Sequence, residues 1–438
     1  MNSKFNWLRL SPPQILVLGF AAIIFIGTAL LMLPISTSTG EPLEFIDALF
    51  TSTSATCVTG LVVVDTGTTF SSFGEVVIML LIQIGGLGFM TMATLFALAL
   101  KRRISLKDRL ILQEAMNQSS MEGIVRLIRR VLLYSLIIEA CGAIILSIRW
   151  AFDMPIGQAI YYGVFHAVTM FNNAGFDLFG DFRSLTGYVY DPVVNVVVMF
   201  LIVSGGIGFI VLSDLIDFRK QRRLSLHSKV VLTMTATLLL VGFVVILIFE
   251  FTNPRTLGSL NWGGKFFGAL FQSVTPRTAG ANTIDITGLR QATQFFIVIL
   301  MFIGASPGST GGGIKTTTFT IMVGAVIAMM RGREDIVMFR YRLAQERVLK
   351  ALTIALLALL LVLTVSMILS TTEEGDFLEI LFETTSAFGT VGLSMGLTPD
   401  LTVFGKVLIS ITMFAGRLGP LTLAYALGPK KGKELYRH

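Results

Sequence analysis

The sequence has few charged residues, few cysteines and few histidines, and each shortage excludes a class of protein. Asp, Glu, Lys and Arg make up 14% of 438 residues against 53% hydrophobic residues, which excludes a soluble globular protein and indicates an integral membrane protein. Cys57 and Cys141 lie far apart, so no disulfide framework is predicted, and the three histidines lack metal-ligand spacing. Since no clustered histidines, paired carboxylates or activated nucleophile appear either, we expect neither a metal centre, a bound cofactor nor an enzyme active site.

The positions of the basic residues indicate topology rather than nucleic-acid binding, although the formal net charge is +7. Most Lys and Arg residues fall in the N-terminal segment, in three connectors near 101–130, 219–229 and 331–350, and in the C-terminal tail. By the positive-inside rule, both termini and these connectors are expected in the cytoplasm, with the chain as a multi-pass membrane protein.

Eight long apolar segments predict transmembrane helices, because each is close to or longer than the roughly 20 residues that cross a bilayer. They occur as four pairs, with first spans at 12–34, 128–152, 226–251 and 347–371 and second spans at 72–100, 192–218, 291–331 and 401–427. Between the paired spans lie apolar segments too short to cross, which predict re-entrant helices at 42–55, 156–171, 262–275 and 376–387.

A short motif follows each re-entrant segment and reveals an internal repeat of roughly 110 residues. Each copy begins with a phenylalanine and has a glycine ten residues later, except in the third copy, where the spacing is nine. The pairs are Phe50 and Gly60, Phe165 and Gly175, Phe271 and Gly280, and Phe382 and Gly392. We therefore expect an all-α integral membrane protein with four tandem repeats of span, pore helix and span around one pseudo-fourfold ion pore. The predicted boundaries are the N-terminus 1–11, repeats 12–100, 128–218, 226–331 and 347–427, connectors 101–127, 219–225 and 332–346, and the C-terminus 428–438.

The four tips carry the chemistry of a selectivity filter. An ion that sheds its water needs oxygens held in place, and backbone carbonyls turned inward at glycine supply them without a side chain in the lumen. The expected filter residues are Cys57, Val58, Thr59, Gly60, Asn172, Asn173, Ala174, Gly175, Thr278, Ala279, Gly280, Gly389, Thr390, Val391 and Gly392. Carbonyl ends of the re-entrant helices would add negative partial charge, and their Ser and Thr side chains could brace the filter. A glycine at a tight turn without an ion site is the alternative, which four copies in near register make less plausible.

The second spans carry glycine clusters, and the third is interrupted by a long one. The segment 304–317, GASPGSTGGGIKTT, cannot continue a helix, so we predict a broken helix with a mobile intramembrane loop below the filter. Its resemblance to a phosphate-binding loop is superficial, because Ile314 separates glycine from lysine and no strand precedes it. The expected gate residues are Gly308, Gly311, Gly312, Gly313, Lys315 and Arg417. Arg417 is either a pore-facing barrier or a structural cap on broken-helix carbonyls.

Two features stay ambiguous. Asp47, Asp177, Asp285 and Glu383 flank the tips and either concentrate cations or are solvated loop charges. The connector 102–126 is either an amphipathic helix that meets the inner membrane face or a partner, or a solvated link, and 333–347 is equally open.

The tips CVTG, NNAG, RTAG and GTVG, the GASPGSTGGGIKTT loop and the arginine in AGRLGP together closely resemble the Trk/Ktr/HKT superfamily of potassium transporters. The resemblance covers nearly the whole chain and is strongest to the membrane subunit of bacterial Ktr systems. It implies a homodimer in membrane lipid, a separate cytosolic ring of nucleotide-binding regulatory subunits, sodium-stimulated uptake and no partnership with nucleic acid. Glycine in all four tips suits K⁺, whereas serine at the first tip accompanies Na⁺ transport in plant relatives. The third tip's shorter spacing leaves its register open.

The sequence thus predicts a potassium-selective, channel-like translocating subunit that carries only monovalent cations, with K⁺ as cargo and Na⁺ as a further candidate. The alternative within transport is a sodium-selective or weakly selective cation pathway. A polytopic enzyme lacks its catalytic constellation, and a structural or receptor scaffold would leave four glycine tips and a broken helix unexplained.

Overall fold

The computed structural model describes residues 12–88, 124–307 and 309–427. The predicted cytoplasmic termini, most of the connector 102–126, the last part of the span 72–100 and the gate residue Gly308 lie outside the described residues. Within those residues the chain is helical, apart from one two-stranded antiparallel hairpin.

Four long helices form where the first spans were predicted: α1 (Pro12–Leu31), α7 (Ile124–Trp150), α11 (Leu226–Glu250) and α15 (Gln345–Thr372). Each is long and apolar enough to cross a membrane, and the bent pair α9 and α10, whose bounds follow, would count as a fifth span among the described residues. Lys and Arg stay out of their central turns, so these helices expose leucine, isoleucine and valine along much of their length.

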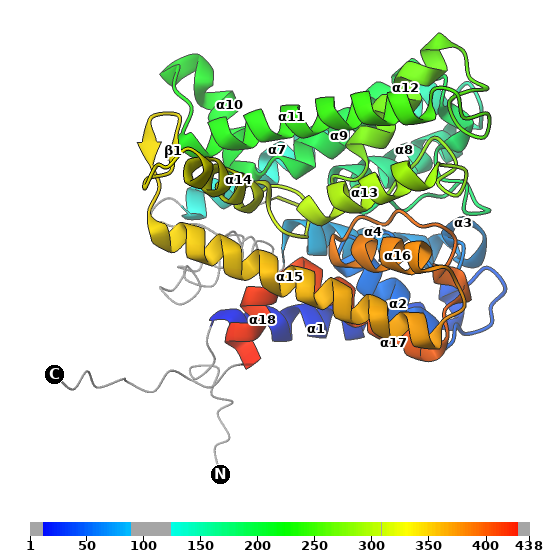
Figure 1. Ribbon diagram of the computed structural model, residues 1–438. Helices are drawn as coiled ribbons and strands as arrows, with labels where there is room; N and C mark the ends of the chain where they lie inside the picture. Colours follow the sequence, from blue (N-terminus) through cyan, green and yellow to red (C-terminus); the bar gives the residue numbers. More distant parts are fainter. Residues whose placement is uncertain (1–11, 89–123, 308, 428–438) are drawn as a thin grey trace.

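Four short helices follow the long ones and agree with the predicted re-entrant segments: α2 (Phe45–Thr56), α8 (Ile156–Phe171), α12 (Trp262–Val274) and α16 (Phe377–Phe388). They lie toward one end of the molecule, whereas α10, α14 and the hairpin lie toward the other (Figure 1). Each consists of 12 to 16 residues and is too short to span a bilayer.

In each unit a further apolar helix ends one or two residues before a glycine with positive φ. These helices are α4 (Ser72–Leu87), α9 (Pro192–Gly206), α13 (Gln291–Ile303) and α17 (Val403–Leu418), and the glycines Gly88, Gly208, Gly304 and Gly419 have φ angles of 82°, 96°, 70° and 91°. A left-handed glycine ends an α-helix because no Cβ opposes that conformation. After the break come α10 (Phe209–Gln221), α14 (Thr316–Met330) and α18 (Pro420–Leu427). The predicted second spans at 192–218 and 401–427 each contain a helix break, and α9 and α10 meet at 103°.

The remaining elements are short. They are η2 (Pro34–Ser36), α3 (Thr66–Thr69), η3 (Thr186–Tyr188), η4 (Thr398–Asp400), β1 (Val337–Met338) and β2 (Tyr341–Arg342). The two strands pair in the connector 333–347, with Phe339 and Arg340 at positive φ in the turn. This connector is a hairpin and not an amphipathic helix.

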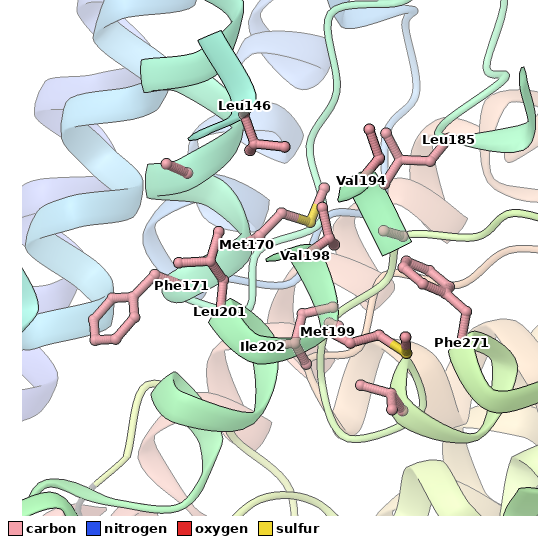
Figure 2. Packing of buried hydrophobic residues seen from close by; sticks show 14 of the residues in the cluster. Leu146, Met170, Phe171, Leu185, Val194, Val198, Met199, Leu201, Ile202 and Phe271 are labelled. Carbon is pink, nitrogen blue, oxygen red and sulfur yellow. The ribbon is translucent and has the colours of Figure 1, made fainter. Parts of the chain in front are cut away.

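The helices form four successive units, called units 1 to 4 below: 12–88, 124–221, 226–330 and 345–427. The phenylalanine that begins each repeat motif lies within a short helix and is almost completely buried. It belongs to the same apolar cluster as residues of the preceding unit, so the apolar clusters join the units in a closed order. The pairs in these clusters are Leu31 and Phe165, Met199 and Phe271, Ile246 and Phe382, and Val365 and Phe50. Figure 2 shows the second pair, with Phe271 of α12 beside Met199 of α9.

Candidate functional site

The segments that follow the four short helices share one backbone conformation. In each unit a non-glycine residue with positive φ is followed two residues later by a glycine with positive φ. The pairs are Val58 and Gly60, Asn173 and Gly175, Thr278 and Gly280, and Thr390 and Gly392. Residues other than glycine rarely adopt the left-handed backbone conformation, so four such residues at equivalent positions indicate a common structural requirement.

The shorter spacing in unit 3 does not shift its register. Helix α12 ends at Val274, and turn residues containing Pro276 take the place of the last helical turn seen in the other units. Proline has no N–H and blocks a helix interior, so the chain leaves the helix early and reaches Thr278 with the same pattern as Val58. The register that the sequence left open is therefore the same in all four tips.

The four glycines form a closed ring. A Cβ built on Gly60 would lie less than 3.0 Å from the carbonyl oxygen of Ala174, the residue before Gly175. The same relation continues around the ring, from Gly175 to Ala279, from Gly280 to Val391 and from Gly392 back to Thr59. Only glycine fits at these positions, and each is in contact with a carbonyl of the next unit. A ring of backbone oxygens of this kind can replace the hydration shell of a cation.

Hydroxyl side chains brace each tip from behind. The residues four positions after the leading phenylalanines are Ser54, Thr169, Thr275 and Ser386. Ser54 and Ser386 accept from the N–H of Gly60 and Gly392 at 3.0 Å, Thr169 accepts from Phe176 N–H at 3.0 Å, and Thr275 donates to the Ala281 carbonyl. Two further hydroxyls, on Ser52 and Ser273, donate to carbonyls of the preceding long helix at 2.6 Å. These bonds fix the tips in their strained conformation.

A cavity of about 420 Å³ lies on one side of the ring and is lined by residues that follow the four tips in the chain. All four ring glycines line it, together with one aspartate from each unit, Asp65, Asp177, Asp285 and Asp400. Burial, helped by the charge of Asp65, raises the pKa of Asp177 to about 7, although the hydrogen bond from Phe179 N–H and the charge of Arg183 act in the opposite direction. The cavity can therefore concentrate cations above the ring, and it does so better when Asp177 is ionised.

Two of the four acidic residues proposed from sequence do not face this cavity. Asp47 forms an ion pair with Lys406 at 2.8 Å. Glu383 is buried and accepts from Ser394 Oγ at 2.7 Å, Met395 N–H at 2.7 Å and Thr398 Oγ1 at 2.5 Å. The sequence left these two residues as either cation-attracting or solvated charges, and neither reading holds, because their partners hold them in the fold. Asp65 and Asp400 were missed, although each follows a tip by fewer than ten residues.

The broken segment between α13 and α14 lies against the inner side of the tips. Ser306 N–H donates to the Gly206 carbonyl at 3.0 Å, and Thr310 N–H and Oγ1 donate to the Gly205 carbonyl at 3.2 and 3.1 Å. Thr310 Oγ1 also lies 3.2 Å from the Phe171 carbonyl. On the opposite side, Gly313 N–H donates to the Gly416 carbonyl at 3.3 Å. The segment is thus held by units 2 and 4.

Two loop glycines pack directly beneath two tips. A Cβ on Gly311 would lie less than 3.0 Å from Thr278 Oγ1, and one on Gly312 less than 3.0 Å from Thr390 Oγ1. Thr278 and Thr390 are the left-handed residues of tips 3 and 4. The loop in this conformation occupies the space under the ring.

Arg417 and Lys315 meet on one loop carbonyl. Arg417 Nη1 donates to the Gly311 carbonyl at 3.2 Å, and Lys315 Nζ donates to the same oxygen at 2.9 Å. Arg417 Nη2 donates to the carbonyls of Gly85 and Gly86, at the end of α4, at 2.7 and 3.1 Å. No carboxylate lies within 4.0 Å of either cation among the described residues. Arg417 therefore donates to carbonyls at the end of α4 and also to the loop, which joins these two segments.

One buried carboxylate behind tip 2 was missed from sequence. Glu139 of α7 accepts from Asn172 Nδ2 at 3.1 Å and from Gln83 Nε2 at 3.0 Å, and its side chain is nearly inaccessible. A glutamate in an apolar span is a signal in itself, but its partners lie 33 and 56 residues away in the chain. Among the described residues no group of His, Cys, Asp and Glu is arranged to hold a metal ion.

Comparisons with known proteins place these features in context. The family model TrkH, described as a cation transport protein, matches residues 11–429. The chain is 49% identical over 425 residues to the Ktr system potassium uptake protein B of Bacillus subtilis, covering 97% of this chain and 95% of that protein. It is 42% identical to the potassium/sodium uptake protein NtpJ of Enterococcus hirae, covering 96% and 93%. The crystal structure of the potassium transporter TrkH from Vibrio parahaemolyticus has the same fold, with a TM-score of 0.76 at 18% identity over 98% of this chain and 87% of that one.

Proposed function

Because the chain belongs to the TrkH family of cation transport proteins, and is a transporter and not an enzyme, we propose that it is the potassium-translocating membrane subunit of a bacterial uptake system. Its relatives are named as proteins of the Ktr system, which supports a component that works with others. In this proposal, eight spans and four pore loops surround one pore, with both termini in the cytoplasm.

The observation that carries the proposal is the ring in which each glycine touches the carbonyl of the next unit. Carbonyls of Thr59, Ala174, Ala279 and Val391 would coordinate a dehydrated K⁺, and the other predicted tip residues complete the filter. The short helices point their carbonyl ends toward this ring, which favours a cation there.

We further propose that the loop 304–315 is the gate. Gly311, Gly312 and Gly313 allow it to pack under the tips, while Arg417 and Lys315 hold it there and place positive charge on the ion path. Release of the loop would be controlled by a cytosolic nucleotide-binding ring, supplied by a separate polypeptide. A homodimer and stimulation by Na⁺ belong to the same proposal.

The test of the filter is rubidium uptake and growth on low potassium in a bacterial host without its own uptake systems, with a Ktr-type regulatory subunit coexpressed. Gly392→Ser would place Cβ against the Thr59 carbonyl in a backbone that L-residues avoid. Gly40→Ser is the matched control, since Gly40 has a φ of 77° and no atom within 4 Å of its Cβ position.

Wild type and Gly40→Ser should restore growth, whereas Gly392→Ser should lose most uptake or admit Na⁺. Equal uptake and equal preference for K⁺ over Na⁺ in all three would exclude the fourth tip from the ion path.

A second candidate function is a weakly selective pathway for K⁺ and Na⁺. The observation in its favour is the 42% identity to a relative named as a potassium/sodium uptake protein. Uptake of labelled Na⁺ by the wild type, measured with and without competing K⁺, separates the two functions.

A further inference from the structure

The side chain of Asn172, the first residue of tip 2, is completely buried and contacts two other helices. Its Nδ2 donates to Oε1 of Gln83 in α4 at 2.7 Å, to Oε1 of Glu139 in α7 at 3.1 Å and to the Val168 carbonyl in α8 at 2.9 Å. An amide nitrogen carries two N–H groups, so these three acceptors share them. Tip 2 is therefore tied through one side chain to α4 of unit 1 and to α7 of its own unit.

Glu139 closes this set of contacts. Gln83 Nε2 donates to Glu139 Oε2 at 3.0 Å, so each oxygen of the carboxylate accepts from a different amide. Glu139 is 6% exposed, and in the parts of the chain that the structure describes no Lys or Arg nitrogen lies within 4.0 Å of its carboxylate. A carboxylate inside an apolar span is costly unless it has partners. Glu139 therefore depends on the amides of Gln83 and Asn172, and they depend on it.

The Asn172 amide is also packed against the backbone of α4. A Cβ built on Gly86 would lie less than 3.0 Å from Asn172 Oδ1. Gly86 follows Gln83 by three residues, so the two lie on the same side of α4. Asn172 thus cannot move closer to α4, and its bonds to Gln83 and Glu139 prevent it from moving away.

The position of Asn172 affects the ring itself. Ala174, two residues later, supplies the carbonyl oxygen that meets Gly60, and the residue between them, Asn173, has a φ of 58°. A displaced Asn172 would therefore move a ring oxygen through one strained residue. Apolar side chains would pack α4, α7 and α8 together equally well, whereas a satisfied polar network fixes one arrangement of the groups that it joins. The buried network indicates that the position of tip 2 is what these bonds secure.

We propose that Glu139 is a positioning residue of the ion path, which holds Asn172 and therefore the tip 2 carbonyls at the spacing that selects K⁺. It acts through Asn172 and not by contact with the ion, and Gln83 is the second support. The proposal rests on the proposed function, since it needs the ring to be the filter. Loss of the carboxylate loosens tip 2, weakens K⁺ binding and reduces the preference for K⁺ over Na⁺.

The test measures K⁺ and Na⁺ binding by the purified full chain, from the rise in its melting temperature with the concentration of each ion. Glu139→Gln has the same shape, but its amide nitrogen cannot accept a hydrogen bond. K⁺ binding should weaken roughly tenfold, and the ratio of K⁺ to Na⁺ affinity should fall. Gln83→Met, which removes only the second support, should have the same effect at roughly two- to fivefold.

Tyr161→Phe is the matched control. The Tyr161 hydroxyl donates to Glu75 Oε2 at 2.7 Å, so it also joins α8 to α4, but in the N-terminal halves of these helices and away from Asn172. This variant should leave the ratio of K⁺ to Na⁺ affinity unchanged.

An exchange variant tests whether the network itself is responsible. Gln83→Glu/Glu139→Gln exchanges the carboxylate and the amide, so the same numbers of donors and acceptors can pair again around Asn172. It should recover most of the K⁺ affinity that Glu139→Gln loses.

Three results would overturn the proposal. The first is equal K⁺ affinity and an equal ion ratio in the wild type and Glu139→Gln; where that variant does not fold, Gln83→Met takes its place in this comparison. The second is the same loss in Tyr161→Phe, which would assign the effect to general contact between units 1 and 2. The third is an exchange variant that binds K⁺ as weakly as Glu139→Gln, which would separate Glu139 from its two amide partners.

Rubidium uptake in proteoliposomes separates this inference from the proposed function. Glu139→Gln should raise the half-saturating Rb⁺ concentration by a factor similar to its loss of K⁺ affinity, with little change in the maximal rate. Selective K⁺ binding by a wild type that carries no rubidium would contradict the transport function alone. Normal uptake by the wild type, with unchanged binding and uptake in Glu139→Gln, would contradict the positioning role alone.

Discussion

Replacement of Thr310 by valine should release the loop without altering any charge. Thr310 is completely buried, and its hydroxyl is shared between the carbonyls of Phe171 and Gly205 at 3.2 and 3.1 Å. Valine has nearly the same shape but no donor. The substitution therefore removes one anchor between the loop and unit 2 and leaves Arg417, Lys315 and the ring in place.

The size of the effect follows from the energy of one hydroxyl hydrogen bond. Such a bond contributes roughly 0.5–1.5 kcal/mol net, which corresponds to a roughly 2- to 13-fold change in an equilibrium constant. If the loop limits flux, the fraction of released loop and the basal rubidium uptake should rise by that factor, up to the rate of a fully open pore.

The assay is rubidium uptake by proteoliposomes that contain the purified chain without a regulatory subunit. Thr320→Val is the matched control, because Thr320 Oγ1 makes a comparable bond, at 2.7 Å, to the Thr316 carbonyl within α14 and does not touch the loop. An unchanged rate in Thr310→Val, or the same increase in Thr320→Val, would refute the idea that this bond holds a gate closed.

Three further changes test other parts of the site. Arg417→Gln loses charge-assisted bonds to Gly311 and to α4, each contributing roughly 1.5–3 kcal/mol; basal uptake in the same proteoliposomes should therefore rise more than in Thr310→Val, and an unchanged rate would leave Arg417 as a helix cap only. Acidification of the outer solution from pH 8 to 6 should lower uptake at limiting Rb⁺ by a factor of roughly two to five, because Asp177, with a pKa of about 7, becomes neutral there. Asp177→Asn should show the lower rate at both pH values, and a variant with an unchanged pH profile would exclude this carboxyl group. Glu250→Gln should lower the free energy of unfolding by roughly 1–3 kcal/mol, since this carboxylate accepts four hydrogen bonds, two from Asn253 and Thr256 after α11 and two from Arg290 N–H and Thr293 at the start of α13; thermal denaturation measures the loss, and equal melting temperatures would contradict it.

The helices and tips could be predicted because their signals are local and recur. An apolar run fixes a long helix through hydrophobicity, so α11 begins at Leu226 and ends at Glu250 within one residue of its predicted bounds. The leading phenylalanine and the tip glycine mark each copy, and the bracing hydroxyl recurs at a constant distance from that phenylalanine. A pattern present four times can be read even where one copy is irregular.

The helix breaks were underestimated because they depend on a single residue conformation. The clusters at Gly88, Gly208 and Gly419 were visible, but an isolated glycine also occurs inside helices at a cost of roughly 1 kcal/mol. Tertiary packing decides between the two: at Gly205 and Gly416 a Cβ would lie less than 3.0 Å from the carbonyl at the end of a short helix. Because α9 and α17 pack this closely against the ends of the short helices, each has to break by the glycine three residues later, at Gly208 and at Gly419.

The roles of Asp47 and Glu383 could not be predicted, because their partners come together only in the folded chain. Lys406 pairs with Asp47 across 359 residues, which joins unit 4 to unit 1. No periodicity reports such a pair, since it exists only after the ring has closed. Glu383 is closer to its partners, but its role depends on a chain reversal after tip 4 that sequence spacing does not specify.

A ring made from one chain can be symmetric where it binds an ion and asymmetric where it is regulated. The backbone of the four tips is equivalent, yet the residues before the left-handed positions are Cys57, Asn172, Arg277 and Gly389. Asn172 is tied to Glu139, whereas a homotetramer would have to repeat any such side chain four times. The loop occurs in unit 3 alone and its arginine in unit 4 alone, and they meet beneath a ring that needs only glycines and carbonyls. Substitutions in the loop should therefore change the rate of ion flux with little effect on selectivity, while substitutions of ring glycines should change selectivity first.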